Sequence, residues 1–233
     1  MLLPNHLYKY RCWNDNAKDI IRQHALYFPN NTQLNDPADC KRPINCEPSL
    51  KNVMQAVENS NDYSEQHKHQ LRAKVQAYDV NRTEKMIHKA IGNFGICSMS
   101  INPDIPKMWN EYADQYRGFC LVFDAKKDFN YFNSGFPVKY VDKIPPYTYI
   151  PQSPTLIREL MGYKTKIWEE EEEFRLFRSA SQIVSNGSSR LFQFNPLSLV
   201  GIIFGKNAST DIQNEVRELC KNSGLEHIQF FHS

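Results

Sequence analysis

The stretch that decides the fold is KIWEEEEEFRLF, residues 166–177, in which five consecutive glutamates lie between a tryptophan and a phenylalanine. Like charges repel and are costly to bury, so such a run is ordinarily solvated. The last part, EFRLF, has the aromatic and alternating character of a strand. We therefore predict a helix that ends near Trp168, followed by an extended segment over residues 171–177.

Alternate side chains of an extended segment point to opposite faces. Glu171, Glu173 and Arg175 would line one polar wall, while Phe174 and Leu176 would enter the core. Two carboxylates on one strand face lie roughly 6–7 Å apart, a separation that would allow both to contact one bound sugar. One would accept a hydrogen bond from a ribose hydroxyl, and the other would activate a nucleophile or stabilise an oxocarbenium-like transition state. The alternative interpretation is a partly exposed ion pair between Glu173 and Arg175.

The sequence on either side of this stretch predicts one α+β domain, residues 1–233, with a mixed or antiparallel sheet. Asn14 or Asp15 is expected to cap a helix, and Ser209 is expected to cap the last one. Alternating or continuous apolar patterns predict strands at residues 7–13, 26–28, 94–100, 118–125, 136–142 and 199–204, with a final strand near the end of the sequence.

Residues 49–91 are predicted to be a polar helical insertion within this domain. The segment SLKNVMQAVENS has apolar residues at helical spacing, and two further helical patterns follow it. Such an insertion would be able to cover one face of the domain as a flap.

The composition is that of an ordinary globular protein, with 41% hydrophobic and 23% charged residues and a net charge of +2. The sequence contains no GxxxxGK or GxGxxG loop, no apolar run of the about 18 residues that span a membrane, and no signal-peptide pattern. Its histidines lack metal-ligand spacing and its cysteines form no CxxC pair. We therefore predict no metal, no membrane partner, and free thiols in a cytoplasmic protein.

Several stretches together resemble the bacterial family catalogued as domain of unknown function 2971. The resemblance covers most of the chain in the right order, although residues 47–92 carry no motif, and it implies kinship rather than activity. The matching motifs are Y-K-Y-R at Tyr8–Arg11, N-D-P at Asn35–Pro37, M-W-x-x-Y-A at Met108–Ala113 with Gly118, and K-x-x-x-W-x-x-E-x-E-x-R from Lys164 to Arg175.

A more distant resemblance concerns the order of three motifs. An arginine, then Ser-x-Ser on a strand, then Glu-x-Glu on a strand is similar to the order in arginine-type ADP-ribosyltransferases. Here these would be Arg11, Ser98 with Ser100, and Glu171 with Glu173. The resemblance implies that Arg11 binds the NAD phosphates, that the serine strand shapes the nicotinamide pocket, and that Glu173 is catalytic. A guanidinium fork suits pyrophosphate oxygens, and a carboxylate suits a ribosyl cation.

Further residues are candidates for the same NAD site. Trp109 and Tyr112 lie three positions apart on a predicted helix, so they share a face and would stack on nicotinamide or adenine. The alternative is that they pack the helix on the sheet. Arg175, on the polar wall, is a third candidate. Asn35, Asp36 and Pro37 are predicted to make an Asx-type turn, and the alternative is that Asp36 orients Arg11 in the site.

The leading hypothesis is therefore an effector, such as a toxin or a phage-defence protein, that uses NAD for ADP-ribose transfer to an unknown macromolecule or for NAD hydrolysis. The second is a non-catalytic binding or regulatory module in which the E-x-E-x-R segment is a structural polar network. The third is a nucleic-acid effector, because residues 66–89 contain basic side chains interleaved with acids and histidines. These basic residues are Lys68, Arg72, Lys74, Arg82, Lys85 and Lys89.

Overall fold

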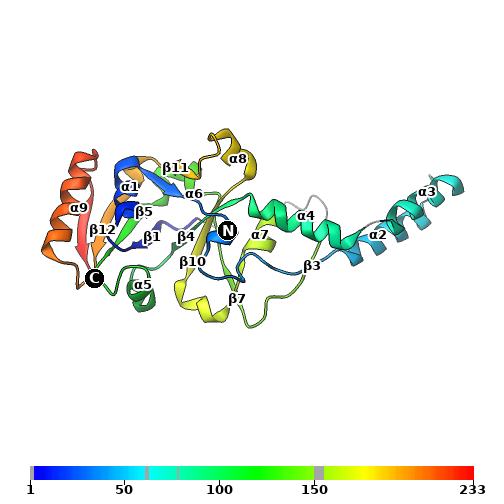
Figure 1. The fold of residues 1–233 in the computed structure, drawn as a ribbon, viewed down its shortest axis with the longest axis horizontal. Coiled ribbons are helices and arrows are strands. Elements are labelled where there is room, and N and C mark those ends of the chain that lie inside the picture. The colour runs from blue at the N-terminus through cyan, green and yellow to red at the C-terminus, as the bar shows by residue number, and fades with distance from the viewer. Residues whose placement is uncertain (1–2, 61–62, 78, 150–154) are drawn as a thin grey trace.

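The computed structural model describes residues 3–60, 63–77, 79–149 and 155–233. Within these residues, a mixed sheet of seven strands forms the centre of the protein, in the order β13-β12-β5-β1-β4-β10-β6 (Figure 1). Neighbouring strands are antiparallel except β12 and β13, which are parallel. The predicted α+β class with a mixed sheet is confirmed. The strands are β1 His6–Arg11, β4 Gly95–Ser100, β5 Phe119–Asp124, β6 Phe136–Pro137, β10 Glu173–Arg178, β12 Leu199–Phe204 and β13 Gln229–His232.

Helices and short strand pairs surround this sheet. The strand pairs of the described residues are β2 Ala25–Tyr27 with β11 Leu191–Gln193, β3 Ile44–Asn45 with β8 Tyr147–Thr148, and β7 Lys139–Val141 with β9 Tyr163–Thr165. The α-helices are α1 Asp15–Gln23, α2 Glu47–Asn59, α3 Glu65–Gln76, α4 Val80–Gly92, α5 Pro106–Glu111, α6 Phe129–Phe132, α7 Leu156–Met161, α8 Ala180–Ser185 and α9 Thr210–Asn222. The 3-10 helices are η1 Asn31–Gln33, η2 Ala125–Asp128, η3 Lys166–Glu171 and η4 Pro196–Ser198.

The main hydrophobic core is built from the central strands together with α1 and α9. As predicted, Phe174 and Leu176 of β10 enter this core, where they are 3% and 0% exposed. The predicted caps are also confirmed. The Asn14 side chain accepts a hydrogen bond from the Ala17 N–H, and the Ser209 side chain caps α9 in the same way.

The acidic stretch is helical first and extended afterwards, but the boundary lies later than predicted. The 3-10 helix η3 ends at Glu171 rather than near Trp168, and β10 begins at Glu173. Between them, Glu172 adopts the left-handed conformation, with φ 43° and ψ 51°. The predicted strand at residues 136–142 is likewise divided: β6 pairs with β10, whereas β7 pairs with β9.

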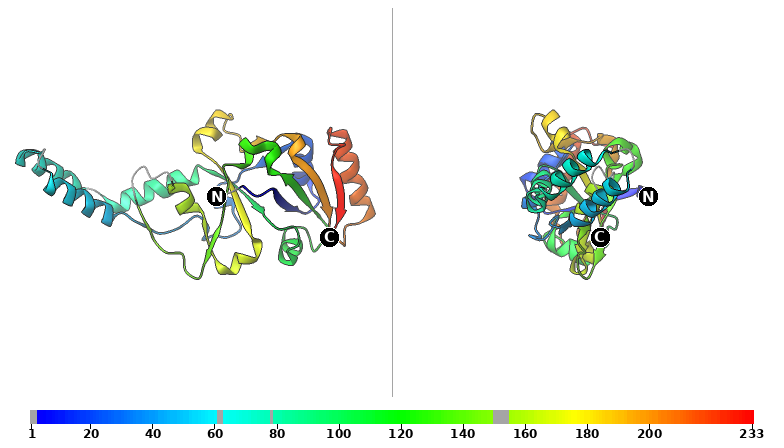
Figure 2. Two further views of the ribbon diagram at one scale, coloured as in Figure 1. Left: turned by 180° about the vertical axis from the view of Figure 1, so that it is seen from behind. Right: turned by 90° about the vertical axis from the view of Figure 1, so that its right-hand side faces the viewer.

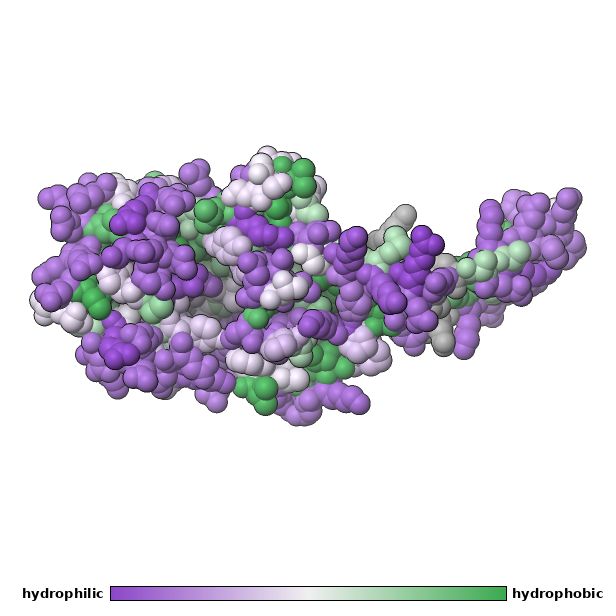
Figure 3. Space-filling view, in the orientation of Figure 1, coloured by the Kyte–Doolittle hydropathy of each residue, from purple (hydrophilic) through white to green (hydrophobic). Residues whose placement is uncertain are grey.

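Helices α2 and α3 project away from the sheet as an arm, and α4 leads back from it (Figures 1 and 2). In this arrangement α2 and α3 do not lie over a face of the domain as a flap (Figures 1 and 2). The arm surface is mostly hydrophilic, so it has little apolar area to bury against a sheet (Figure 3). Its two helices instead contact each other through a bidentate ion pair, in which Arg72 donates two hydrogen bonds of 2.6 Å to Glu58.

The central sheet opens between β1 and β4. Within the described residues, β1 pairs with β5 from His6↔Asp124 to Arg11↔Phe119, but its register with β4 contains the single pair Tyr8↔Ser100. On the other side, β4 stays paired with β10 along its whole length. Beyond the Tyr8 pair the two strands line the two sides of a cavity. The sheet topology thus places β1, β4 and β10, which carry the three predicted motifs, next to one another.

Gly118 allows the end of β1 to approach the turn before β5. A Cβ atom at this position would collide with the carbonyl oxygen of Arg11 and would lie 3.0 Å from the Cα of Cys12. Because backbone atoms move at a larger cost than side chains, Gly118→Ala is expected to lower the free energy of unfolding by about 1–3 kcal/mol. Urea denaturation followed by circular dichroism measures this change.

The matched control for this variant is Gly92→Ala at the end of α4. A Cβ atom there would meet only the Asn31 Oδ1 atom, at 3.5 Å, which is ordinary contact. Its stability should change by no more than about 1 kcal/mol, because alanine favours the helix over glycine. Equal stability of Gly118→Ala and the parent protein would contradict the close approach.

Candidate functional site

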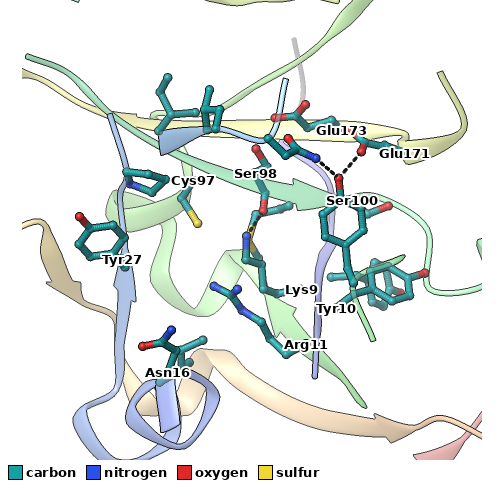
Figure 4. A pocket seen from close by; sticks show the side chains of 18 of the residues that line it. Lys9, Tyr10, Arg11, Asn16, Tyr27, Cys97, Ser98, Ser100, Glu171 and Glu173 are labelled. Atoms are coloured by element: carbon teal, nitrogen blue, oxygen red, sulfur yellow. Dashed lines mark hydrogen bonds between the residues drawn. The ribbon is translucent and has the colours of Figure 1, made fainter. Parts of the chain in front are cut away.

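A cavity of about 620 Å³ lies where β1 and β4 diverge (Figure 4). Its walls come from β1, β4, α1 and β2, from the segment around η1, and from the acidic stretch. Small-molecule sites usually have volumes of about 300–1,000 Å³, so the cavity has the size of a binding site for a nucleotide-sized ligand.

Most of the predicted site residues line this cavity although they come from four different segments of the chain. They are Arg11, Ser98, Ser100, Tyr112, Glu171 and Glu173. The sheet brings them together, because Ser100 lies opposite Tyr8 of β1 on one side and opposite Glu173 of β10 on the other.

Trp109 does not line the cavity. It is 1% exposed in a small core cluster, where its ring stacks on Tyr116 and meets Tyr10 edge-on. Its Nε1 atom donates to the Pro103 carbonyl at 2.9 Å. For this residue the structure shows the alternative interpretation, packing of the helix on the sheet, whereas Met108 faces the cavity beside Tyr112.

The five glutamates divide into two groups. Glu169, Glu170 and Glu172 are exposed, whereas Glu171 and Glu173 are 4% and 3% exposed and line the cavity. The left-handed Glu172 joins η3 to β10 with a sharp change of direction, so the residues on either side of it both face inward. Most of the acidic run is therefore solvated, and two of its carboxylates are buried.

Glu173 belongs to a buried network of charges. Arg175 donates to both of its oxygens, from Nε at 2.8 Å and from Nη2 at 2.9 Å, and Lys164 Nζ lies 3.0 Å from it. Burial by itself would raise the pKa of Glu173, but the charges of Arg175 and Lys164 outweigh burial and hold this pKa well below its usual range. Glu173 is therefore an ionised carboxylate held in one orientation.

Arg175 lies behind the cavity wall rather than in it. Its side chain is 0% exposed, and its two terminal nitrogens donate to Asp39 at 2.9 Å each. The partly exposed ion pair that was the alternative interpretation of Glu173 and Arg175 is instead fully buried. Arg175 holds Glu173 and Asp39 in place from behind.

Glu171 is bound less completely. Its Oε1 atom accepts a hydrogen bond of 2.6 Å from the Tyr112 hydroxyl, and its Oε2 atom accepts one of 2.7 Å from Lys164. Asn35 in turn donates to the Tyr112 hydroxyl at 2.6 Å. Burial and the neighbouring Glu171 raise the pKa of Tyr112, so the phenol keeps its proton and donates it. Each oxygen of Glu171 retains acceptor capacity for a ligand.

The two serines have different surroundings. The Ser100 hydroxyl donates to the Asn102 carbonyl at 3.1 Å and accepts from the Asn102 N–H at 3.2 Å, so it stabilises the turn after β4. Ser98 lies opposite Arg175 in the register, and its side chain helps to lower the pKa of Glu173. Of the two serine side chains, that of Ser98 therefore interacts with Glu173, whereas that of Ser100 is engaged by Asn102.

Sequence analysis missed the roles of Asp39, Lys164 and Lys9. Asp36, whose alternative role was to orient Arg11, is half-buried and closes a turn by accepting a hydrogen bond from the Ala38 N–H at 2.8 Å. The predicted Asx turn is confirmed, but the buried aspartate is Asp39. Lys164 is part of the quoted K-x-x-x-W motif, which was a usable signal, whereas nothing near Asp39 in the sequence points to Arg175.

Lys9 and Arg11 extend from β1 toward the cavity (Figure 4). Lys9 Nζ donates to the Ser98 carbonyl at 2.5 Å, across the opening of the sheet. Burial lowers the pKa of Lys9, and the Arg11 charge acts in the same direction. The buried Nε atom of Arg11 has no hydrogen-bond partner among the described residues.

In the part of the chain that the structure describes, no group of three or more His, Cys, Asp or Glu is arranged to hold an ion. In the same residues, no helix has both the length and the apolar character needed to cross a membrane.

Two of the six basic residues proposed for nucleic-acid contact have acidic partners on the arm. Lys68 lies 3.5 Å from Glu65, and Arg72 is bound to Glu58. The nucleic-acid hypothesis stays a prediction that these contacts do not favour.

A family model matches part of the chain. The model of a family described as "Protein of unknown function (DUF2971)" matches residues 108–176, which include Tyr112, Lys164 and both buried glutamates. No curated protein and no solved structure matches the chain. The family predicted from the motifs is thus supported over this segment, and the resemblance to ADP-ribosyltransferases stays a prediction.

Proposed function

Starting from a chain whose residues 108–176 match the DUF2971 family, we propose that this protein cleaves the N-glycosidic bond of NAD and transfers ADP-ribose to a macromolecule or to water. One observation carries the proposal. A single cavity contains two buried carboxylates, Glu171 and Glu173, together with an arginine, Arg11, whose Nε atom has no partner in the described residues. The two carboxylates would stabilise a ribosyl cation, and the arginine would bind a phosphate.

The buried charges favour a cationic transition state. Asp39, Glu171 and Glu173 contribute three negative charges, and Lys164 and Arg175 contribute two positive charges, so the cluster has a net charge of −1. When the bond between ribose C1′ and the nicotinamide nitrogen breaks, the electron pair leaves with nicotinamide and the ribose becomes cationic. Fixed negative charge in a site of low dielectric lowers the energy of that state without reorganisation.

Glu173 and Glu171 would have different roles in the reaction. Glu173 is held ionised and immobile by Arg175 and Lys164, which fits electrostatic stabilisation of the cation. Glu171 retains acceptor capacity, so it would accept the proton of the incoming nucleophile as the new bond to C1′ forms. Lys164 bonds to both carboxylates and would keep them at a constant separation.

The test is release of nicotinamide from NAD by the purified protein and by Glu173→Gln. Glutamine preserves the shape and removes the charge, so we expect the rate to fall by about 10²- to 10³-fold. The control is Glu170→Gln, the same substitution at an exposed position of the same run, which should keep the parent rate. Equal rates for Glu173→Gln and the parent protein would remove Glu173 from the mechanism.

A non-catalytic binding or regulatory module is the second candidate, because one observation favours it. Both oxygens of Glu173 are already bound by Arg175, so the network is complete at this residue without a ligand. Titration calorimetry with NAD separates the two candidates. Absence of binding heat, together with a melting temperature that NAD does not raise, would favour the structural network.

A further inference from the structure

Two cations face the cavity from the same side of one strand. Lys9 and Arg11 are two residues apart on β1, so their side chains point to the same face of the sheet, and both line the cavity (Figure 4). Across the ion pairs of the described residues, neither side chain has a carboxylate partner. A half-buried pair of like charges without a counter-ion is unfavourable unless an anion binds to it.

The acids of the cavity are not free to neutralise this pair. Glu171 is bound by Lys164 and the Tyr112 hydroxyl, and Glu173 is bound by Lys164 and Arg175. Both acids are thus already paired with cations, and Lys164 is shared between them. Lys9 and Arg11 take no part in these ion pairs.

Both Lys9 and Arg11 have N–H donors that are not used in hydrogen bonds within the described residues. The Nε atom of Arg11 is buried and without a hydrogen-bond partner in the described residues, which is unfavourable unless a ligand accepts from it. Lys9 donates one of its three N–H groups to the Ser98 carbonyl oxygen, and that hydrogen bond fixes the ammonium at the cavity wall. The remaining N–H groups of Lys9 are available to an acceptor.

We infer that Lys9 and Arg11 form a site for two linked phosphoryl groups, one cation for each phosphate. Residues two apart on a strand are separated by roughly 6–7 Å, and the flexible side chains can converge on a pyrophosphate from that spacing. The cavity would therefore select a compound with a pyrophosphate linkage over a mononucleotide. That the compound is NAD rests on the proposed function, whereas the anion site rests on the strand geometry alone.

The test uses inorganic pyrophosphate and orthophosphate as probes in titration calorimetry with the full chain. We expect the parent protein to bind pyrophosphate more tightly than orthophosphate. Lys9→Met should weaken pyrophosphate binding by about tenfold or more, because a hydrogen bond to a charged group contributes about 1.5–3 kcal/mol. Lys9→Arg should retain binding, and Lys126→Met, which removes one positive charge from an exposed position, should bind as the parent does.

The Lys9 to Ser98 bond also stabilises the opened sheet, so Lys9→Gln serves as a second variant that keeps a donor and lacks the charge. The inference would be overturned if folded Lys9→Met or folded Lys9→Gln bound pyrophosphate with the affinity of the parent protein. It would also be overturned if the parent protein did not prefer pyrophosphate to orthophosphate. A parent protein that binds pyrophosphate through Lys9 but releases no nicotinamide would keep the anion site and reject the proposed function. Nicotinamide release at an unchanged KM in Lys9→Met would keep the function and reject the role of Lys9.

Discussion

Replacement of Arg175 by methionine is expected to lower the free energy of unfolding by about 3–5 kcal/mol, the usual cost of removing one partner from a buried ion pair. Arg175 is 0% exposed and donates to Glu173 and to Asp39 through two nitrogens each. Without it, two carboxylates remain in the interior with Lys164 as their cation. Methionine fills a volume similar to that of arginine. The decrease in the free energy of unfolding would therefore come from the missing charge and not from a cavity. Urea denaturation measures it.

Arg117→Met is the matched control for this variant. Arg117 forms a bidentate pair with Asp114, but both side chains are exposed, so its removal should cost no more than about 1 kcal/mol. The triple variant Arg175→Met with Asp39→Asn and Glu173→Gln should recover part of the stability, since it removes the unpaired charges. A loss below about 1 kcal/mol for Arg175→Met would mean that the bridge to Asp39 is not formed.

Glu171→Gln is expected to reduce the rate of NAD cleavage by about 10²- to 10⁴-fold, the range for loss of a general base. The same variant should stay folded. Glutamine still accepts a hydrogen bond from the Tyr112 hydroxyl, and Lys164 keeps Glu173 and Asp39 as partners, so the stability should fall by about 1 kcal/mol. Nicotinamide release and thermal melting, measured on one preparation, separate the two effects.

The contrast between the two buried glutamates sharpens this prediction. Glu173→Gln breaks the bidentate pair with Arg175 and should lower both rate and stability, whereas Glu171→Gln should lower mainly the rate. Glu170→Gln, at an exposed position, should change neither. If Glu171→Gln cleaved NAD as fast as the exposed control, Glu171 would have no role as a base.

Sequence periodicity by itself determined much of the local structure. The alternation in EFRLF placed Phe174 and Leu176 in the core, and the cap residues fixed where α1 and α9 begin. These features follow from short-range rules, because side-chain direction repeats every two residues in a strand and caps act within one helical turn. The order of the motifs also anticipated which residues line one cavity.

Only the tertiary structure decided how deeply Glu171 and Glu173 are buried and what balances their charge. The partners of Glu173 include Arg175 two residues away, but Arg175 is in turn held by Asp39, 136 residues earlier in the chain. The burial of Trp109 likewise depends on a small core cluster built from several segments. The direction of the arm depends on its polar surface, which has little apolar area to pack against the sheet (Figure 3). Periodicity specifies which face of an element is buried, whereas pairing of charges across a fold depends on contacts between segments that no local pattern encodes.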